Sequence, residues 1–543
     1  MNRRANAEFW RSLFLVQAIV AALVLGMRAW VAWAGLSASL ARADVYYFLY
    51  FAFEPIAAAL MLAATVFAFL LHRRVSDATA MPRGPIWYWV AGAFAVLTWA
   101  GLVWVVCRYP LSRDEATLLF QAKIFGEGRV VAPVRADLIP ALWPASPQFL
   151  VTHSAGGFWH SMYWPVYSLM LAPFGRLGAP EILNPLIGGA TVIVALRYFR
   201  ARGFGAAATM GAMSLLVCGT GFWCMSMTYY ALPAHALLNL IFALLMLRGG
   251  AARAVGAGAV GSLALCLHQF VPHALFALPW WLSLVRAREW RRLALMAIGY
   301  APMSLAFGVG WLVLSSGADQ ACVDKLSLGR MLSALASGSF DLGLEMPSAS
   351  KLLLQALPVT QLILWSAPAL PVLAVLGFRA GAWEGEDWRW ACALALTMIF
   401  YAFVPYTPGH GWGYRYAYPV WMALIVVGST VFRHDTGLKL LVPTLATGVI
   451  ALALLLPYRA WQMGSFVRQR LAPLEVFRDW PGVVFVNPAG GWYHEDYIAN
   501  DPFLRNRPLF LFSRGPEADA AAAASLGMAA KYFPEEKPAG DCR

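Results

Sequence analysis

Residues 86–126 read IWYWVAGAFAVLTWAGLVWVVC followed by RYPLSRDEATLLFQAKIFG, and this stretch decides the class of protein. Its first part, residues 86–107, carries no charged side chain and is long enough to cross a bilayer as one helix. The acidic pair Asp114-Glu115 follows at once. Apolar residues then recur at helical spacing: Leu118, Leu119, Ala122 and Phe125. We therefore expect an amphipathic helix on the membrane surface, ending near residue 126, with the acidic pair at its N-terminus.

The composition of the whole chain points to the same class. Of 543 residues, 60% are hydrophobic and 13% are charged, whereas a soluble domain carries about 25% charged residues. This excludes a soluble enzyme, a disordered chain and a disulfide scaffold. A β-barrel is excluded because its strands alternate and do not run apolar for a whole span. The net charge is +13, but the basic residues lie in short turns between apolar runs, which predicts membrane orientation rather than nucleic-acid binding.

The apolar runs predict an all-α polytopic membrane protein with about thirteen spans. Arg3, Arg4 and Arg11 place the N-terminus in the cytoplasm, and the later Arg-rich turns all fall on that same side. The C-terminus is then extracytoplasmic. The short cytosolic turns favour a bacterial inner membrane. The predicted spans are about 12–34, 45–71, 86–107, 182–199, 206–222, 229–247, 254–269, 271–285, 293–314, 359–378, 390–405, 414–432 and 438–457.

The spans divide the chain into two parts. Residues 1–457 form the transmembrane domain, with extracytoplasmic loops at 108–181 and 315–358. Residues 458–543 form a small C-terminal extracytoplasmic domain, in which the short apolar runs 482–486 and 508–512 predict two strands of an α/β fold. Cys322 and Cys542 lie outside the spans and can pair if both face an oxidising compartment.

Asp114 has two possible roles. It can cap the surface helix together with Ser112 or Glu115, because carboxylate and hydroxyl oxygens accept hydrogen bonds from the free amides of a first turn. It can also act as a general base that faces a cavity at lipid level. Caps are common, so the spacing alone favours the capping role.

Three further groups of polar residues lie on the predicted outer face. The segment 152–174 contains His153, His160 and Tyr163 ahead of a short apolar run, which predicts an interfacial or re-entrant helix. Its histidines near the acidic pair raise the possibility of a divalent metal, although their spacing matches no recognised ligand pattern. A second group lies at the outer ends of spans and either faces a cavity or makes hydrogen bonds between helices. It comprises His235, His268, Gln269 and His273.

The third group is the loop of residues 408–419, which contains His410, Tyr414 and Arg415. An outer arginine runs against the positive-inside bias. Because a guanidinium matches a phosphate in geometry and charge, Arg415 suits a phosphate at headgroup depth. The alternative is a lipid-headgroup or carbonyl contact that anchors the helix.

In order and sidedness, these regions resemble the GT-C glycosyltransferases, a superfamily that includes protein O-mannosyltransferases, lipid A aminoarabinose transferases and mycobacterial arabinofuranosyltransferases. The resemblance covers about residues 108–432. It rests on Asp114-Glu115 with its surface helix, on a second interfacial helix at about 158–174, on Asn184-Pro185 at the next span, and on the segment from His410 to Pro419. Two features depart from the family pattern: two additional spans precede the acidic loop, and Trp164-Pro165-Val stands where Pro-Pro or Pro-Leu is common.

The resemblance implies an inverting sugar transfer from a polyprenyl-phosphate donor to an acceptor hydroxyl. It implies Asp114 as the general base, with Glu115 beside it in the catalytic site. Arg415 would hold the donor phosphate. Further donor-binding residues would be Lys123, His410, Tyr414, His235, His268 and Tyr163. The alternatives are a transporter or flippase, an acyltransferase or O-antigen ligase that uses an intramembrane histidine, and a non-catalytic scaffold.

Overall fold

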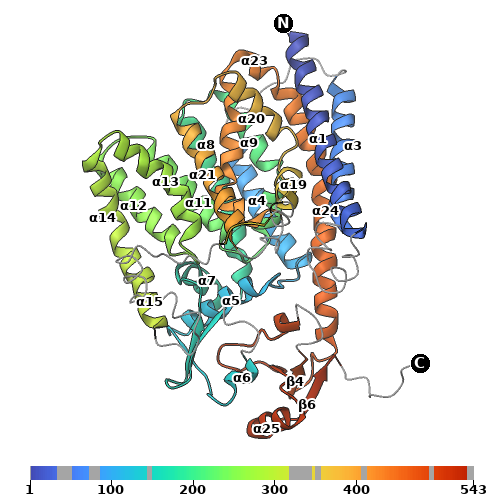
Figure 1. Cartoon of the computed structure of the whole chain (residues 1–543), viewed down its shortest axis with the longest axis vertical. Coiled ribbons are helices and arrows are strands. Elements are labelled where there is room, and N and C mark those ends of the chain that lie inside the picture. Colours follow the sequence, from blue (N-terminus) through green and yellow to red (C-terminus); the bar gives the residue numbers. More distant parts are fainter. Residues whose placement is uncertain are drawn as a thin grey trace.

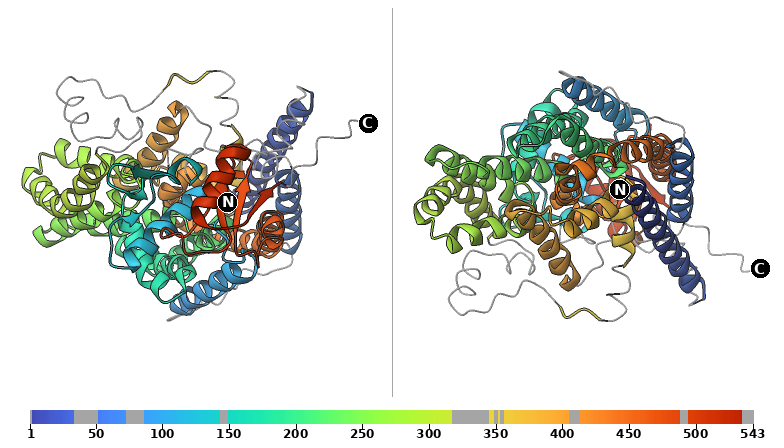
Figure 2. Two further views of the ribbon diagram at one scale, coloured as in Figure 1. Left: turned by 90° about the horizontal axis from the view of Figure 1, so that it is seen from below. Right: turned by 90° about the horizontal axis from the view of Figure 1, so that it is seen from above.

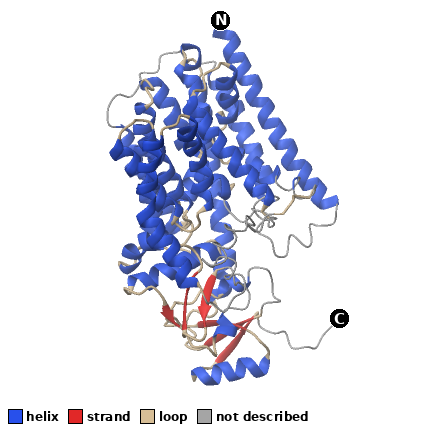
Figure 3. Cartoon of the chain, turned by 60° about the vertical axis from the view of Figure 1, so that its left-hand side comes forward, coloured by secondary structure: helices blue, strands red, loops and turns tan. Residues whose placement is uncertain are grey.

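The computed structural model describes residues 2–33, 52–72, 86–142, 149–316, 345–348, 352, 356–404, 413–487 and 494–534. Helices form a long body, and the strands gather at one end of it (Figures 1 and 3). The N-terminus lies at the opposite end of the body from the strands (Figure 1). The outer strands and the surface helix α5 therefore lie on the side predicted to be extracytoplasmic.

The helices of the body match the predicted apolar runs in position. They are α1 (Asn2–Trp33), α3 (Glu54–His72), α4 (Ile86–Trp104), α8 (Leu183–Ala201), α9 (Ala206–Val217), α10 (Thr220–Ser226), α11 (Leu232–Met246), α12 (Ala251–Leu265), α13 (Val271–Arg286), α14 (Trp290–Met303), the π-helix η3 (Ser304–Val309), α15 (Gly310–Ser315), α19 (Ala356–Leu364), α20 (Leu370–Arg379), α21 (Gly385–Phe403), the 3₁₀ helix η4 (Arg415–Val420), α22 (Met422–Ser429), the 3₁₀ helix η5 (Thr430–Arg433), α23 (Asp435–Leu438) and α24 (Leu441–Glu475).

Among the described residues, six helices are long and apolar enough to cross a membrane, or seven if the bent pair α9 and α10 is one span. The multi-pass helical architecture is therefore present, and the count of thirteen spans stays a prediction. Two of the predicted spans are divided into shorter helices that contain prolines. The span predicted at 359–378 contains α19 and α20, and Pro371 lies in the first turn of α20. The span predicted at 414–432 contains η4, α22 and η5, and Pro419 lies inside η4.

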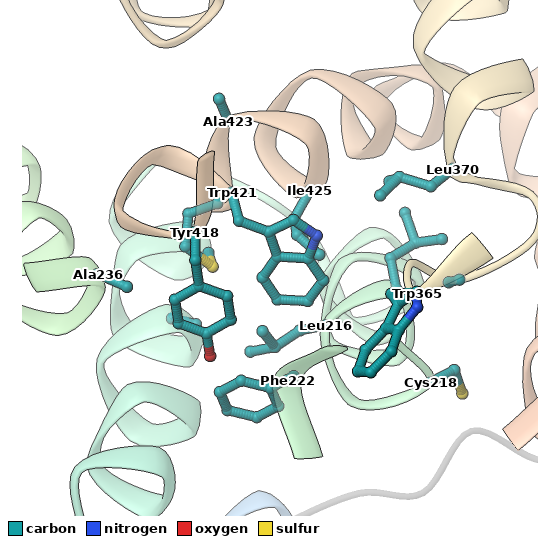
Figure 4. Packing of buried hydrophobic residues seen from close by; sticks show 14 of the residues in the cluster. Leu216, Cys218, Phe222, Ala236, Trp365, Leu370, Tyr418, Trp421, Ala423 and Ile425 are labelled. Atoms are coloured by element: carbon teal, nitrogen blue, oxygen red, sulfur yellow. The ribbon is translucent and has the colours of Figure 1, made fainter. Parts of the chain in front are cut away.

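Aromatic packing fixes the C-terminal end of η4, the element that carries Arg415. Trp421 stacks on Tyr418 and on Phe222 of α10, with ring centroids 5.8 and 6.1 Å apart (Figure 4). Its indole N–H donates to Ser366 Oγ. Gly413 lies next to the Trp365 ring and has φ +69°, a backbone conformation that favours glycine. The late segment is thereby held against the middle of the body.

A buried ion pair joins α3 to α24. Arg459 donates from both terminal nitrogens to the two carboxylate oxygens of Glu54, each at 2.8 Å, and its guanidinium lies 4.2 Å from the Trp365 ring centroid. Both charged side chains are almost fully buried. A bidentate pair supplies the compensation that two buried charges require, so the helical body tolerates an arginine inside an apolar helix.

The outer part contains the surface helix α5 (Arg113–Gly126) and the further helices α6 (Ile139–Leu142), η2 (Pro180–Ile182) and α7 (Val166–Arg176). It also contains an antiparallel sheet in the order β1 (Ala132–Pro133), β3 (Phe158–Ser161), β2 (Leu150–His153). In its register, Val151 pairs with His160. The helix predicted at 158–174 is therefore wrong in its first half, because 158–161 pairs as a strand and the helix begins only at Val166, after Pro165.

The C-terminal segment holds a second, parallel sheet in the order β5 (Leu509–Phe512), β4 (Val483–Val486), β6 (Ala530–Phe533), with η7 (His494–Tyr497) before β5 and α25 (Pro516–Leu526) between β5 and β6. The strands predicted at 482–486 and 508–512 are present, and β6 was not predicted. The boundary placed after residue 457 falls inside a helix, because α24 continues to Glu475.

The C-terminal segment has a small apolar cluster of its own around Val486, Tyr497, Ile498 and Phe512, and it shares a second cluster with the first outer segment. Side chains of β4 and β5 share one apolar cluster with α5, β3 and the residues around them; its members include Phe120, Ile124, Trp159, Phe485 and Leu511. Seen from below, the red C-terminal elements lie over the centre of the molecule (Figure 2). The first outer segment and the C-terminal segment therefore form one joint outer layer.

Candidate functional site

Asp114 lies in the first turn of α5 and makes polar contacts with residues from two other segments. Its carboxylate accepts hydrogen bonds from the Tyr163 hydroxyl, from Arg415 Nη1 at 2.8 Å and from Ser112 Oγ at 3.3 Å. Ser112 occupies the N-cap position but makes no side-chain cap hydrogen bond. The side chain of Asp114 is 22% exposed, which leaves it accessible to a small group such as a hydroxyl.

Arg415 reaches Asp114 from a segment 301 residues further along the chain. It is buried, donates from Nη2 to the Tyr416 hydroxyl at 3.1 Å, and lies about equally far from the rings of Tyr230 and Tyr416. Within the described residues its Nε is buried without a hydrogen-bond partner. A buried guanidinium with an unused donor is suited to an additional anion, because charge-assisted hydrogen bonds are the strongest available to it.

Tyr163 and His268 are aligned by a backbone pairing between two loops. The amides of Trp164, Val166 and Tyr167 donate to the carbonyls of His268, Cys266 and Leu267 at 3.0–3.1 Å. This pairing sets the Tyr163 and His268 rings edge to face with centroids 5.6 Å apart. Tyr163 therefore contacts both Asp114 and the histidine pair.

His235 and His268 form a hydrogen-bonded pair, with His235 Nε2 2.9 Å from His268 Nδ1. His235 is fully buried, and its Nδ1 has no partner among the described residues. An unpaired buried acceptor is tolerated better than an unpaired N–H, so we assign the proton of His235 to Nε2. His268, the half-buried member of the pair, then accepts at Nδ1 and carries its own proton on Nε2.

Glu115 is oriented away from Asp114 and holds backbone instead. Its Oε2 accepts the amides of Leu111 at 3.3 Å and Tyr229 at 3.0 Å, and the side chain is fully buried. Burial raises the pKa of this carboxyl to about 8, so it is mostly protonated at neutral pH. The geometry favours a positioning role for Glu115 rather than the catalytic role predicted for it.

Three other predicted site residues are Lys123, Tyr414 and His410. Lys123 is in the last turn of α5, and its ammonium lies 3.7 Å from Asp501 of the C-terminal segment. Tyr414 is buried next to Arg415. His410 lies outside the described residues, as do Cys322 and Cys542.

Three further histidines of the predicted outer face are His153, His160 and His273. His273 contacts Asn239 and Tyr300 through its two ring nitrogens, both at 2.7 Å, so the inter-helix hydrogen-bond role predicted as its alternative is confirmed. His153 and His160 stack with ring centroids 5.7 Å apart. In the part of the chain that the structure describes, no group of three or more His, Cys, Asp or Glu side chains is arranged to hold a metal ion.

Tyr230 and Tyr416 were not predicted as site residues. Both place their rings about 5 Å from the Arg415 guanidinium. His235 and Arg415, which lie near them in the sequence, were predicted as site residues. The sequence does not distinguish a site tyrosine in an aromatic-rich outer loop from a tyrosine that only anchors the protein at the membrane interface.

These features are those of a multi-pass helical membrane protein: a helical body, a surface helix with an acidic pair behind an apolar span, and a late outer arginine. The chain resembles ArnT, the aminoarabinose transferase, from Cupriavidus metallidurans, with TM-scores of 0.51 for its apo state and 0.50 for its crystal structure bound to undecaprenyl phosphate. In both cases the sequences are 15% identical, and the match covers 82% of this chain and 89% of that one.

A more distant structural likeness is to the arabinosyltransferase EmbB from Mycobacterium smegmatis, with 16% identity, a TM-score of 0.35, and coverage of 70% of this chain and 34% of that one. No family model matches the sequence, and no curated protein matches it. At the level of the fold, the likeness to ArnT confirms the GT-C resemblance predicted from the residues.

Proposed function

We propose that the protein is an inverting glycosyltransferase that moves a sugar from a polyprenyl-phosphate donor to an acceptor hydroxyl at the outer face of a bacterial inner membrane. The observation that carries this proposal is the meeting of Asp114 and Arg415, 2.8 Å apart and held beside Tyr163. One is a base and the other an anion-binding group, which are the two groups that displacement of a sugar from a phosphate requires. The fold supports the proposal, since ArnT has been crystallised with undecaprenyl phosphate.

Asp114 is better suited than Glu115 to be the base. A general base must be ionised and within hydrogen-bonding reach of the proton it removes. Glu115 is fully buried with its pKa raised to about 8, whereas the Asp114 carboxylate is partly exposed and paired with a guanidinium. Tyr163 and Arg415 fix the orientation of the Asp114 carboxylate. A carboxylate oxygen would therefore already be oriented to accept the proton of a bound hydroxyl.

Arg415 would serve the leaving group. Its unpaired Nε can donate to a donor phosphate while Nη1 stays near Asp114. The donor is a phosphodiester with one negative charge, and the departing polyprenyl phosphate gains a second. A buried arginine stabilises that developing charge more than the charge already present in the donor. The Nε2–H of His268 would supply a further donor on the same side.

The reaction is a single displacement. The acceptor oxygen forms a bond to the anomeric carbon as the bond from that carbon to the phosphate oxygen breaks, and the electron pair of that bond leaves with the phosphate. The acceptor proton passes to Asp114. The anomeric centre inverts, and no covalent sugar–enzyme intermediate is formed.

The test uses purified protein in nanodiscs and a panel of radiolabelled polyprenyl-phosphate sugars with a cell-envelope extract as acceptor. We expect one donor to be consumed, free polyprenyl phosphate to appear in equal amount, and the product to have the opposite anomeric configuration. Retention of configuration, or loss of donor without release of polyprenyl phosphate, contradicts the proposal.

A further inference from the structure

A chain of buried hydrogen bonds runs from η4, the helix that carries Arg415, through α11 and α13 to α14. Asn239 of α11 donates from Nδ2 to the Pro419 carbonyl of η4 at 2.9 Å. Its Oδ1 lies 2.7 Å from Nδ1 of His273 on α13, and Nε2 of His273 lies 2.7 Å from the Tyr300 hydroxyl on α14. Asn239 and His273 are fully buried. The chain therefore connects a helix of the candidate site to three helices of the body.

The position of each proton in this chain follows from the Pro419 carbonyl, because a carbonyl oxygen only accepts hydrogen bonds. The amide nitrogen of Asn239 therefore donates to it, and the Asn239 oxygen is left to accept from Nδ1 of His273. In the neutral ring Nε2 is then the acceptor, and the Tyr300 hydroxyl donates to it. Each side chain thus fixes the orientation of the next, and the last contact in the series is the one to η4.

Helix η4 needs contacts from outside to fix its position. It spans six residues, Arg415–Val420, and is a 3₁₀ helix, in which hydrogen-bond geometry is poorer than in an α-helix. Pro419 also removes one backbone donor from it. Asn239 lies one helical turn after His235 on α11, so the same face of α11 contacts both the histidine pair and η4.

We propose that Asn239 is a positioning residue, which fixes η4 and thereby the placement of the Arg415 guanidinium beside Asp114, and that His273 and Tyr300 hold its amide in the donating orientation. Its effect on sugar transfer rests on the proposed function, whereas its effect on η4 does not.

The kinetic consequence follows from the shared helix. Arg415 and Pro419 belong to the same short element, so a shift of the Pro419 carbonyl also moves Arg415. A misplacement of about 1 Å can lower a rate about 10²-fold. Because Arg415 would act mainly on the charge that develops on the leaving phosphate, the loss should appear in kcat more than in KM.

The test replaces Asn239 with leucine, which has the same branched shape and neither donates nor accepts. We expect Asn239→Leu to lower kcat for donor consumption about 10–100-fold, with KM changed less than about threefold. Hydrogen exchange of the peptide that contains residues 415–421 should become faster. Ser262→Ala is the matched control, because buried Ser262 donates to the Tyr300 carbonyl of α14 at 2.7 Å rather than to η4. It should keep kcat and the exchange of residues 415–421 close to those of the wild type.

A double-mutant cycle shows whether Asn239 acts through Arg415. In an Arg415→Ala background, followed in single turnovers, the guanidinium is absent, so Asn239→Leu should lower the rate less than about threefold further. A loss as large as that in the wild-type background overturns the inference. Tyr300→Phe is a milder second variant, which removes the donor to His273 but keeps Asn239. It should lower kcat by a smaller factor than Asn239→Leu and also speed the exchange of residues 415–421.

The inference is overturned if Asn239→Leu behaves like Ser262→Ala in kcat or in the exchange of residues 415–421. If Asn239→Leu does not fold, wild-type kcat and exchange in Tyr300→Phe overturn it instead. The proposed function fails separately. If the wild type consumes no donor, the transferase is refuted, and faster exchange of residues 415–421 in Asn239→Leu alone still identifies Asn239 as the residue that fixes η4.

Discussion

Replacing Glu115 with glutamine should change how stability depends on pH. Glu115 is fully buried, and its pKa is raised from 4.5 to about 8, chiefly by burial. Between these values the folded protein binds more protons at this position than the unfolded chain does, so the free energy of unfolding falls as pH rises. The contribution is fully present below pH 4.5 and is lost as pH rises through about 8.

The size of the effect follows from the two pKa values. One unit corresponds to about 1.4 kcal/mol, so ionising Glu115 in the folded state costs up to about 5 kcal/mol. About half of this, roughly 2–3 kcal/mol, is lost between pH 5 and pH 7. Glutamine keeps a carbonyl oxygen to accept the amides of Leu111 and Tyr229 but does not ionise. The free energy of unfolding of Glu115→Gln should therefore depend less on pH than that of the wild type.

The assay is thermal unfolding of purified protein in one detergent from pH 5 to pH 8.5. We expect the midpoint of Glu115→Gln to exceed that of the wild type increasingly as pH rises. Glu517→Gln, at an exposed glutamate of α25, is the control and should follow the wild type at every pH. Parallel curves for Glu115→Gln and wild type across this range would refute the assignment of a buried, protonated Glu115.

Three further variants test the site and the body. Arg415→Lys should lower kcat for donor consumption about 10²–10³-fold, because an ammonium lacks the planar fork that lets a guanidinium contact Asp114 and a phosphate together. An unchanged kcat would show that Arg415 does not take part in the reaction. Tyr163→Phe should slow transfer about 10–100-fold at unchanged stability, since it removes a hydrogen bond to a charged acceptor; a wild-type rate would show that Asp114 needs no such orientation. Arg459→Leu should destabilise the protein by about 3–5 kcal/mol in thermal unfolding, because it leaves Glu54 buried and unpaired. Adding Glu54→Leu to this variant should recover most of the lost stability. An Arg459→Leu protein as stable as the wild type would contradict the buried ion pair.

Much of the helical body could be predicted because a bilayer requires every spanning backbone to satisfy its own hydrogen bonds, so long apolar runs become helices. The prediction failed where tertiary contacts override the pattern. Helix α24 continues past residue 457 because Arg459 finds Glu54 on another helix. Residues 158–161 form a strand because 150–153 pairs with them.

The candidate site could be predicted only as separate groups on one face. Sidedness placed Asp114, Tyr163 and Arg415 outside the membrane, but spacing cannot show that two residues 301 positions apart form an ion pair. The family resemblance put Lys123 in the same site as Asp114, as a donor-binding residue, and both lie on one surface helix. The structure separates them, since Lys123 lies at the far end of α5 beside Asp501.

The most direct test of the proposed chemistry compares wild type and Asp114→Asn for release of polyprenyl phosphate from the donor that the panel identifies. Asparagine preserves the shape of the side chain and removes its capacity to take a proton. We expect Asp114→Asn to bind the donor and to unfold at a temperature close to that of the wild type, while its transfer rate falls about 10²–10⁴-fold. Equal rates of donor consumption by the two proteins would contradict the assignment of Asp114 as the base.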